Sequence, residues 1–212
     1  AQGSPFWSPD GQSIGFFAEG SLKRLNIATG SIQRICDASY GVGAAWSEDG
    51  TIVFSSRFGD SLKQVPAAGG RPQPVTILDV SRRESMHGWP HFLPGGKQFA
   101  FLVRTVPEER SSIAIGSLDG GDAKTIVRAD SLTGVHDDHL LYVREGVLYA
   151  HRLDAGAGEL RGDPVEIANV AYSENWALSG VSVRGDTLVY YPPYVPRTDV
   201  VVRCSWRRDV RE

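Results

Sequence analysis

A short turn motif recurs along the chain at intervals of about forty residues. The stretch PFWSPDGQSIGFF, residues 5–17, joins two apolar segments through Trp-Ser-Pro-Asp-Gly. The stretch AAWSEDGTIVFSS, residues 44–56, repeats the Trp-Ser-x-Asp-Gly core. Looser copies follow in residues 89–103, 134–146 and 178–191, where Pro-Gly-Gly, Asp-Asp and Arg-Gly-Asp stand at the turn. A repeat of this length predicts one structural unit stacked several times.

Each copy of the motif is followed by further short apolar segments. SLKRLNIATG and then SIQRICD follow the first copy, and SLKQVPAAGG and then RPQPVTILD follow the second. Gly, Asp and Pro at the junctions are typical of short antiparallel strands joined by tight turns, and no long segment shows a helical period. Four strands per unit predict an all-β fold, namely a β-propeller of about five four-stranded blades.

We expect these blades to form a single propeller domain. The expected blades cover approximately residues 1–38, 39–79, 80–129, 130–171 and 172–212. The last of them has no fourth strand of convincing pattern, so we expect it to be incomplete or to be completed by a terminal strand. An unpaired strand edge there would invite another chain, which makes a homo-oligomer through an open blade edge a hypothesis.

The turn motif itself has a structural explanation. We expect the aromatic residue of each copy, at Trp7, Trp46 and Phe92, to lie between neighbouring blades, where large flat side chains bury the most area. Asp10 and Asp49 are expected to accept hydrogen bonds from backbone amides of their own turns, while the following Gly supplies a positive φ.

The aromatic-Ser-Pro-Asp-Gly turn followed by Ile-x-Phe resembles the TolB-like, WD-like propeller repeat. Residues 7–16 match that pattern fully, and residues 46–54 depart from it at Glu48. The stretches SMHGWPHFLPGG and REGVLYAHRLDAG also resemble the propeller region of some bacterial serine/threonine kinases. This resemblance covers nearly the whole chain and implies a fold whose members mostly bind other molecules.

Composition excludes some classes of partner. The 22 Lys and Arg residues nearly balance the 25 Asp and Glu residues, so the chain lacks the basic surface that nucleic acids require. The apolar runs are too short to cross a bilayer, so we expect no membrane insertion. No signal peptide is visible and residue 1 is not Met, which leaves the localisation unknown. Pairing of Cys36 with Cys204 stays open.

Chemistry is expected in the loops that lead into the first strand of each blade, because these loops surround the mouth of a propeller channel. Those loops are residues 40–44, 82–91, 130–136 and 172–177. The residues predicted to contact a ligand are Arg82, Trp89, His91 and Trp176. The residues predicted to bind a metal ion are Glu84, Glu174, Asn175 and Asp137, and those predicted to act in catalysis are His87 and His136.

Two functions are compatible with these loops. The first is a binding or sensor module that recognises a protein, peptide or small-molecule ligand at the channel mouth. The second is a hydrolase of a small lactone or ester, in which carboxylate and amide oxygens hold Ca²⁺ and a histidine moves a proton. The sequence requires no cofactor, and Ca²⁺ belongs only to the second reading. A purely structural scaffold is a third alternative, so whether the chain is an enzyme stays open.

Overall fold

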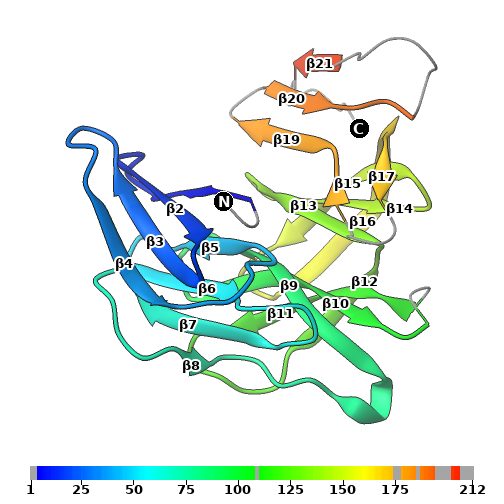
Figure 1. Ribbon diagram of the computed structural model, residues 1–212. Helices are drawn as coiled ribbons and strands as arrows, with labels where there is room; N and C mark the ends of the chain where they lie inside the picture. Colours follow the sequence, from blue (N-terminus) through cyan, green and yellow to red (C-terminus); the bar gives the residue numbers. More distant parts are fainter. Residues whose placement is uncertain (1–3, 108–109, 174–177, 185–186, 194–201, 206–212) are drawn as a thin grey trace. The chain divides into compact units, whose positions relative to one another are not determined.

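The computed structural model describes residues 4–107, 110–173, 178–184, 187–193 and 202–205 (Figure 1). Those residues form antiparallel sheets without an α-helix, and Val80–Arg82 form the short 3-10 helix η1. The chain divides into two compact units, residues 1–127 and residues 128–212. The all-β prediction is therefore confirmed for the described part of the chain.

The first unit contains three four-stranded sheets, in each of which the strands follow one another in chain order. Sheet 1 consists of β1 (Phe6–Trp7), β2 (Ser13–Ala18), β3 (Ser21–Asn26) and β4 (Ile32–Asp37). Sheet 2 consists of β5 (Ala44–Trp46), β6 (Thr51–Ser55), β7 (Leu62–Pro66) and β8 (Gln73–Pro74). Sheet 3 consists of β9 (Glu84–Phe92), β10 (Gln98–Thr105), β11 (Ser112–Ser117) and β12 (Lys124–Arg128), whose last residue belongs to the second unit.

The second unit contains one four-stranded sheet and two smaller ones. The four-stranded sheet consists of β13 (Ser131–His136), β14 (His139–Arg144), β15 (Val147–Asp154) and β16 (Glu159–Asn169). One smaller sheet pairs β17 (Tyr172–Ser173) with β18 (Leu178–Ser179). The other consists of β19 (Val181–Arg184), β20 (Thr187–Tyr190) and β21 (Val202–Ser205). Four complete sheets and these smaller ones agree roughly with the predicted five blades. The blade limits and the single-domain organisation stay predictions.

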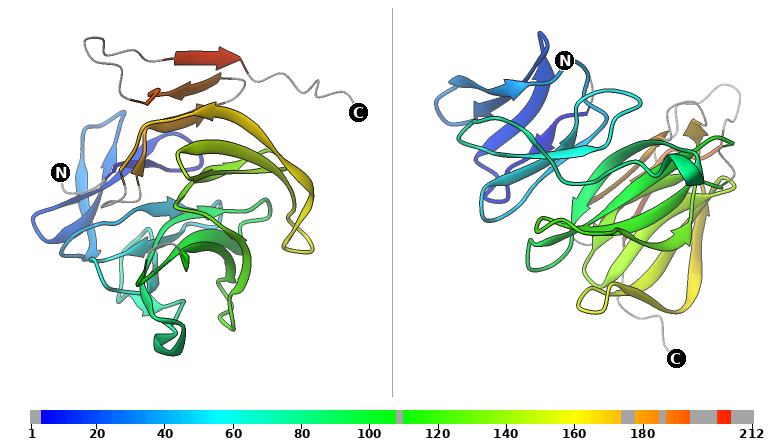
Figure 2. Two further views of the ribbon diagram at one scale, coloured as in Figure 1. Left: turned by 90° about the vertical axis from the view of Figure 1, so that its right-hand side faces the viewer. Right: turned by 90° about the horizontal axis from the view of Figure 1, so that it is seen from below.

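The core of the first unit lies between successive sheets (Figures 1 and 2). Strand β6 shows why, since its side chains alternate between the two faces of sheet 2. Ile52 and Phe54 are buried in a cluster with Phe17 of sheet 1. Val53, between them in sequence, is buried in a cluster with Phe99 of sheet 3. Sheet 2 is therefore covered on both faces, which is the stacked arrangement that the repeat predicted.

The turn chemistry predicted from the motif is confirmed. Asp10 Oδ1 accepts a hydrogen bond from the backbone N–H of Gln12 at 2.9 Å, and Asp49 Oδ1 accepts one from Thr51 at 2.9 Å. The glycine that follows Asp10 has a φ of 68°, and Gly50 has a φ of 86°. Asp10 and Asp49 therefore stabilise their own turns.

The aromatic residues of the motif do not share one environment. Trp46 packs against the first core cluster, with its ring centroid 6.3 Å from that of Phe6. Phe92 packs against Phe99 at 6.2 Å. Trp7 does not belong to the first core cluster, and its place between two blades stays a prediction. It stands on the face of sheet 1 opposite to the one that carries Phe6 and packs on sheet 2.

Candidate functional site

A buried hydrogen-bond network lies at the start of β9. Residues 82–91 were expected to form a loop before this strand, but β9 already begins at Glu84, so that prediction is corrected. Glu84 Oε2 lies 3.1 Å from His87 Nε2 and accepts the backbone N–H of Asp79 at 2.8 Å. His87 Nδ1 lies 2.8 Å from the Thr76 hydroxyl, which accepts the N–H of Leu62 at 2.9 Å. The Glu84 and His87 side chains are 8% and 2% exposed. This network joins β7 to the first strand of sheet 3.

The geometry fixes the roles of these groups at neutral pH. Burial lowers the pKa of His87, and hydrogen bonding to Glu84 opposes this shift. The imidazole is therefore neutral, with a proton on Nε2 that is donated to Glu84 and a bare Nδ1 that accepts from Thr76. His87, predicted to be catalytic, has both ring nitrogens engaged, and its ring packs 4.9 Å from that of Phe101.

The predicted ligand-binding residues near this network differ in exposure. Arg82 lies on the surface at the end of η1 and donates to the Thr125 hydroxyl at 3.2 Å. Trp89 has a φ of 48°, and the register between β9 and β10 shifts beside it. His91 is partly exposed, but dense protein packing around its imidazole lowers the pKa to about 4. The bulge interrupts the alternation that would place Trp89 and His91 on one side of the strand.

The structure places His136 and Asp137 elsewhere than expected. Residues 131–136 form β13 itself rather than a loop that leads into it, so both residues lie where this first strand ends. Asp137 has a φ of 50° and belongs to the tight turn that pairs His136 with His139. Their placement in a loop before the strand is corrected, whereas the turn predicted for HDDH is confirmed.

The other predicted site residues, Glu174, Asn175 and Trp176, lie outside the described residues. Within the described ranges, no three His, Cys, Asp or Glu side chains gather closely enough to hold a metal ion. Glu84, the one predicted metal ligand of the first unit, uses Oε2 to accept two internal hydrogen bonds. The described donors therefore do not fit a Ca²⁺ site. Cys36 is a buried free thiol, and the Cys204 side chain lies outside the described residues.

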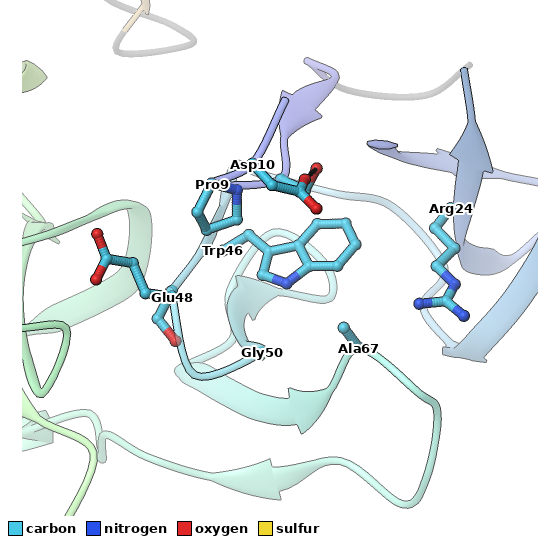
Figure 3. Close-up of a pocket in the computed structure, with 9 residues that line it drawn as sticks. Pro9, Asp10, Arg24, Trp46, Glu48, Gly50 and Ala67 are labelled. Carbon is cyan, nitrogen blue, oxygen red and sulfur yellow. Dashed lines mark hydrogen bonds between the residues drawn. The ribbon is translucent and has the colours of Figure 1, made fainter. Parts of the chain in front are cut away.

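A surface pocket that the sequence did not indicate lies in the first unit, between the β1–β2 turn and the β5–β6 turn (Figure 3). It has a volume of about 530 Å³. It is lined by Ser8, Pro9, Asp10, Arg24, Trp46, Ser47, Glu48, Gly50 and Ala67. Since equivalent turns of two successive repeats form its walls, the repeat alignment is the signal that could have located it.

The side chains of the pocket combine a flat apolar surface with charges of both signs. The indole of Trp46 lies at its centre, with Asp10 on one side and Arg24 across the hollow (Figure 3). Arg24 donates from Nε and Nη2 to Gln33 Oε1 at 3.0 and 2.6 Å, which fixes the guanidinium and leaves Nη1 outside this contact. A hydrogen bond from Ser8 lowers the pKa of Asp10, so that carboxylate is ionised at neutral pH.

Comparison with known proteins identifies the fold. A protein assigned as TolB from Agrobacterium tumefaciens has a TM-score of 0.62 and 21% identity, over 91% of this chain and 71% of that one. Regucalcin from the same organism, described as calcium-binding, has a TM-score of 0.58 and 18% identity, over 79% and 59% of the two chains. A protein assigned as a gluconolactonase has a TM-score of 0.58 and 14% identity, over 89% and 70%.

No protein-family model and no curated protein matches the chain. At identities of 14% to 21%, the three solved structures show the fold alone. Among the described residues, no helix is both long and apolar enough to span a bilayer. The resemblance to TolB-like propellers is confirmed at this level: the chain is a repeat protein of the β-propeller type.

Proposed function

We propose that this chain is a binding module and that the Trp46 pocket is a contact surface for a peptide segment of a partner protein. The observation that carries the proposal is the convergence of Trp46, Arg24 and Asp10 from three strands or turns on one open hollow. Trp and Arg are the side chains that contribute most often to the binding energy of protein interfaces.

The chemistry of the pocket favours a polar peptide over a compact apolar ligand. The indole offers a flat surface on which a side chain or a peptide plane can stack. Arg24 supplies a cationic donor, while Asp10 and Glu48 supply carboxylate acceptors. An extended peptide presents both N–H donors and C=O acceptors, and it therefore matches a wall that carries both kinds of partner.

The test is a selection of peptides from a displayed random library on the wild-type chain, followed by affinity measurements with variants. We expect Arg24→Ala with Glu48→Ala to weaken binding of the selected peptides at least about tenfold, because both charges border the pocket. The matched control is Arg71→Ala, which removes an exposed cation of the same unit outside the pocket. Peptides that bind the double variant as tightly as the wild type would refute the proposed surface.

The recognition surface at the channel mouth, with Arg82, Trp89, His91 and Trp176, stays a prediction beside this one. The homo-oligomer through an open blade edge likewise stays a hypothesis. Substituting Arg82 in the same selected-peptide assay separates the two surfaces. Loss of binding in Arg82→Ala, with binding kept in the Arg24 and Glu48 variant, would move the proposed site to the loop before β9.

The second candidate is the Ca²⁺-dependent hydrolase of a small lactone or ester. It is supported by the similarity to regucalcin and to a protein assigned as a gluconolactonase, and no reaction step is assigned to it. The test measures the unfolding temperature with Ca²⁺ and with EDTA, together with hydrolysis of a panel of lactones and esters. Ca²⁺ at a hundredfold excess over its Kd would add about 2.7 kcal/mol of stability. Equal unfolding temperatures and no hydrolysis would remove this candidate.

A further inference from the structure

The Trp46 pocket lies where the side chains between two successive sheets depart from the repeat. Between sheets 2 and 3, Gln64 of β7 crosses the gap, because its Nε2 donates to the Leu118 carbonyl, just after β11, at 3.3 Å. Arg24 has the position of Gln64 in sheet 1, since each lies opposite the third residue of the preceding strand. Arg24 instead turns along its own sheet and donates to Gln33, which leaves a hollow beside it.

A small residue widens this hollow. Ala67 follows β7 as Leu118 follows β11, and each donates its N–H to the residue that precedes the second strand of its sheet, Gly50 and Lys97 respectively. An alanine therefore lines the pocket at the position where the next sheet carries a leucine. Both walls of the pocket belong to the first unit, and they come from consecutive sheets that pack on each other.

The guanidinium of Arg24 has one donor edge left. Nε and Nη2 form one edge of this planar group, and both donate to Gln33 Oε1, at 3.0 and 2.6 Å. The edge formed by Nη1 and the second N–H of Nη2 carries two parallel donors, whose spacing matches the two oxygens of a carboxylate. Gln33 is neutral, and Arg24 forms no ion pair with an acid of the described residues, so its charge is not compensated there.

The opposite side of the pocket gives a bound peptide its direction. The indole of Trp46 lies at the centre, with Asp10 on one side and Arg24 across the hollow (Figure 3). Asp10 accepts two hydrogen bonds of its own turn on Oδ1, which leaves Oδ2 outside these contacts. That oxygen can accept a peptide N–H, whereas its negative charge disfavours a carboxylate beside it. A peptide with a carboxylate at Arg24 would therefore cross the indole and place N–H donors near Asp10.

We propose that the Arg24 guanidinium holds a carboxylate of the bound peptide, through the donor edge that Gln33 leaves open. This inference rests on the proposed function of the Trp46 pocket, and it names the class of peptide that the pocket takes. An acidic side chain and a free C-terminus present the same pair of oxygens, so both belong to this class.

The test compares matched peptides by isothermal titration calorimetry at one ionic strength. Peptides are selected on the wild-type chain from libraries with free and with blocked C-termini. Each selected peptide is then synthesised without its carboxylates, by amidation of the C-terminus or by replacement of Asp and Glu with Asn and Gln, which separates the two sources. We expect one of these changes to weaken binding to the wild type at least about tenfold, because the charge-assisted pair is lost.

The same change in the peptide should matter little once the guanidinium is absent. In Arg24→Gln, we expect removal of the carboxylate to alter the Kd less than about twofold, because the two partners of a direct contact are coupled. Arg24→Lys keeps the charge but lacks the planar fork, and it should bind the carboxylate peptides at least about fivefold more weakly than the wild type. The matched control is Arg71→Gln, which removes an exposed cation outside the pocket and should leave the effect of the carboxylate unchanged. Circular dichroism checks that each variant is folded.

A variant that fills the pocket distinguishes failure of this inference from failure of the proposed function. Ala67→Leu introduces the residue of the equivalent position in sheet 3, and it should weaken every peptide that uses the pocket, whatever the charge of the peptide. Peptides that lose affinity in Ala67→Leu, but respond equally to carboxylate removal in the wild type and in Arg24→Gln, would overturn this inference alone. Full affinity of the carboxylate peptides for Arg24→Lys would do the same. An empty selection, or peptides that bind Ala67→Leu and the Arg24 and Glu48 double variant like the wild type, would refute the proposed function and this inference with it.

Discussion

The carboxylate of Glu84 lies 3.1 Å from Nε2 of His87, and both side chains are almost entirely removed from solvent. A buried carboxylate is costly unless hydrogen bonds satisfy it, and here the imidazole and the Asp79 amide do so. The pair lies within β9 and holds the backbone of Asp79, which precedes β9, against the start of that strand. Its chemistry is that of a structural bridge, although the same residue types in an open cleft would suggest a proton relay.

Removing the imidazole should therefore destabilise the first unit. We expect His87→Ala to lower the free energy of unfolding by about 2–4 kcal/mol, since it leaves a buried charged acceptor with one partner fewer. Glu84→Gln is the matched control, because its amide oxygen can still accept both hydrogen bonds, and it should cost about 1 kcal/mol. Urea denaturation measures both values. Equal losses in the two variants would contradict the bridge.

The stability of the chain should fall on acidification because of His91. Its pKa is about 4 when folded and near 6.5 when unfolded, so the unfolded state binds more protons between these values. The contribution is complete above pH 6.5 and is lost as the pH falls toward about 4. Because His91 keeps some solvent contact, we expect a loss of about 1–3 kcal/mol over that window.

Thermal unfolding at several pH values tests this expectation for His91. His91→Asn should flatten the pH dependence between pH 6.5 and 4, because the variant no longer has a group that titrates there. His87, whose pKa is also lowered by burial, contributes in the same direction and is left intact in this variant. An unchanged slope in His91→Asn would show that His91 does not carry the effect.

Gly15 of β2 packs closely against the ring of Phe6 in β1, the neighbouring strand of sheet 1, and leaves no room for a larger side chain. A Cβ atom at this position would lie 2.2 Å from the ring of Phe6, which is itself buried. We expect Gly15→Ala to cost about 1–3 kcal/mol through overpacking. Gly156→Ala is the control, because the nearest atom to its new Cβ is the Asp154 carboxylate at 3.6 Å. Chemical denaturation that ranks the two variants equally would contradict the packing argument.

The sequence predicted the strands and turns because their causes are local. The Asp-Gly turns at Asp10 and Asp49 close on their own amides, and the HDDH turn depends on Asp137 adopting a positive φ. The environment of the aromatic residue in each motif depends instead on contacts with other sheets. Trp7 and Trp46 are both followed by Ser-x-Asp-Gly, but Trp46 packs against Phe6 of sheet 1, whereas Trp7 lies on the face of sheet 1 that is turned away from sheet 2.

The candidate sites were less predictable for the same reason. The Trp46 pocket depends on how the turn at Asp10 meets the next repeat and on Arg24 from a third strand, which no short motif records. Glu84 and His87 stood out because acids and histidines in loops suggest chemistry. The sequence could not show that folding buries both of them and pairs them with each other. Whether such a pair is a functional site or a structural bridge depends on its burial, which follows from the tertiary structure.

The thiol of Cys36 should be nearly unreactive in the folded chain. Burial, assisted by the neighbouring Asp37 carboxylate, raises its pKa to about 11, and the thiolate is the species that reacts. In a Cys204→Ser background, we expect a thiol-specific chromogenic disulfide to modify Cys36 at pH 8 at least about a hundredfold more slowly than in urea, where the thiol has its ordinary pKa. Comparable rates in the two conditions would show that β4 opens readily and exposes the thiol.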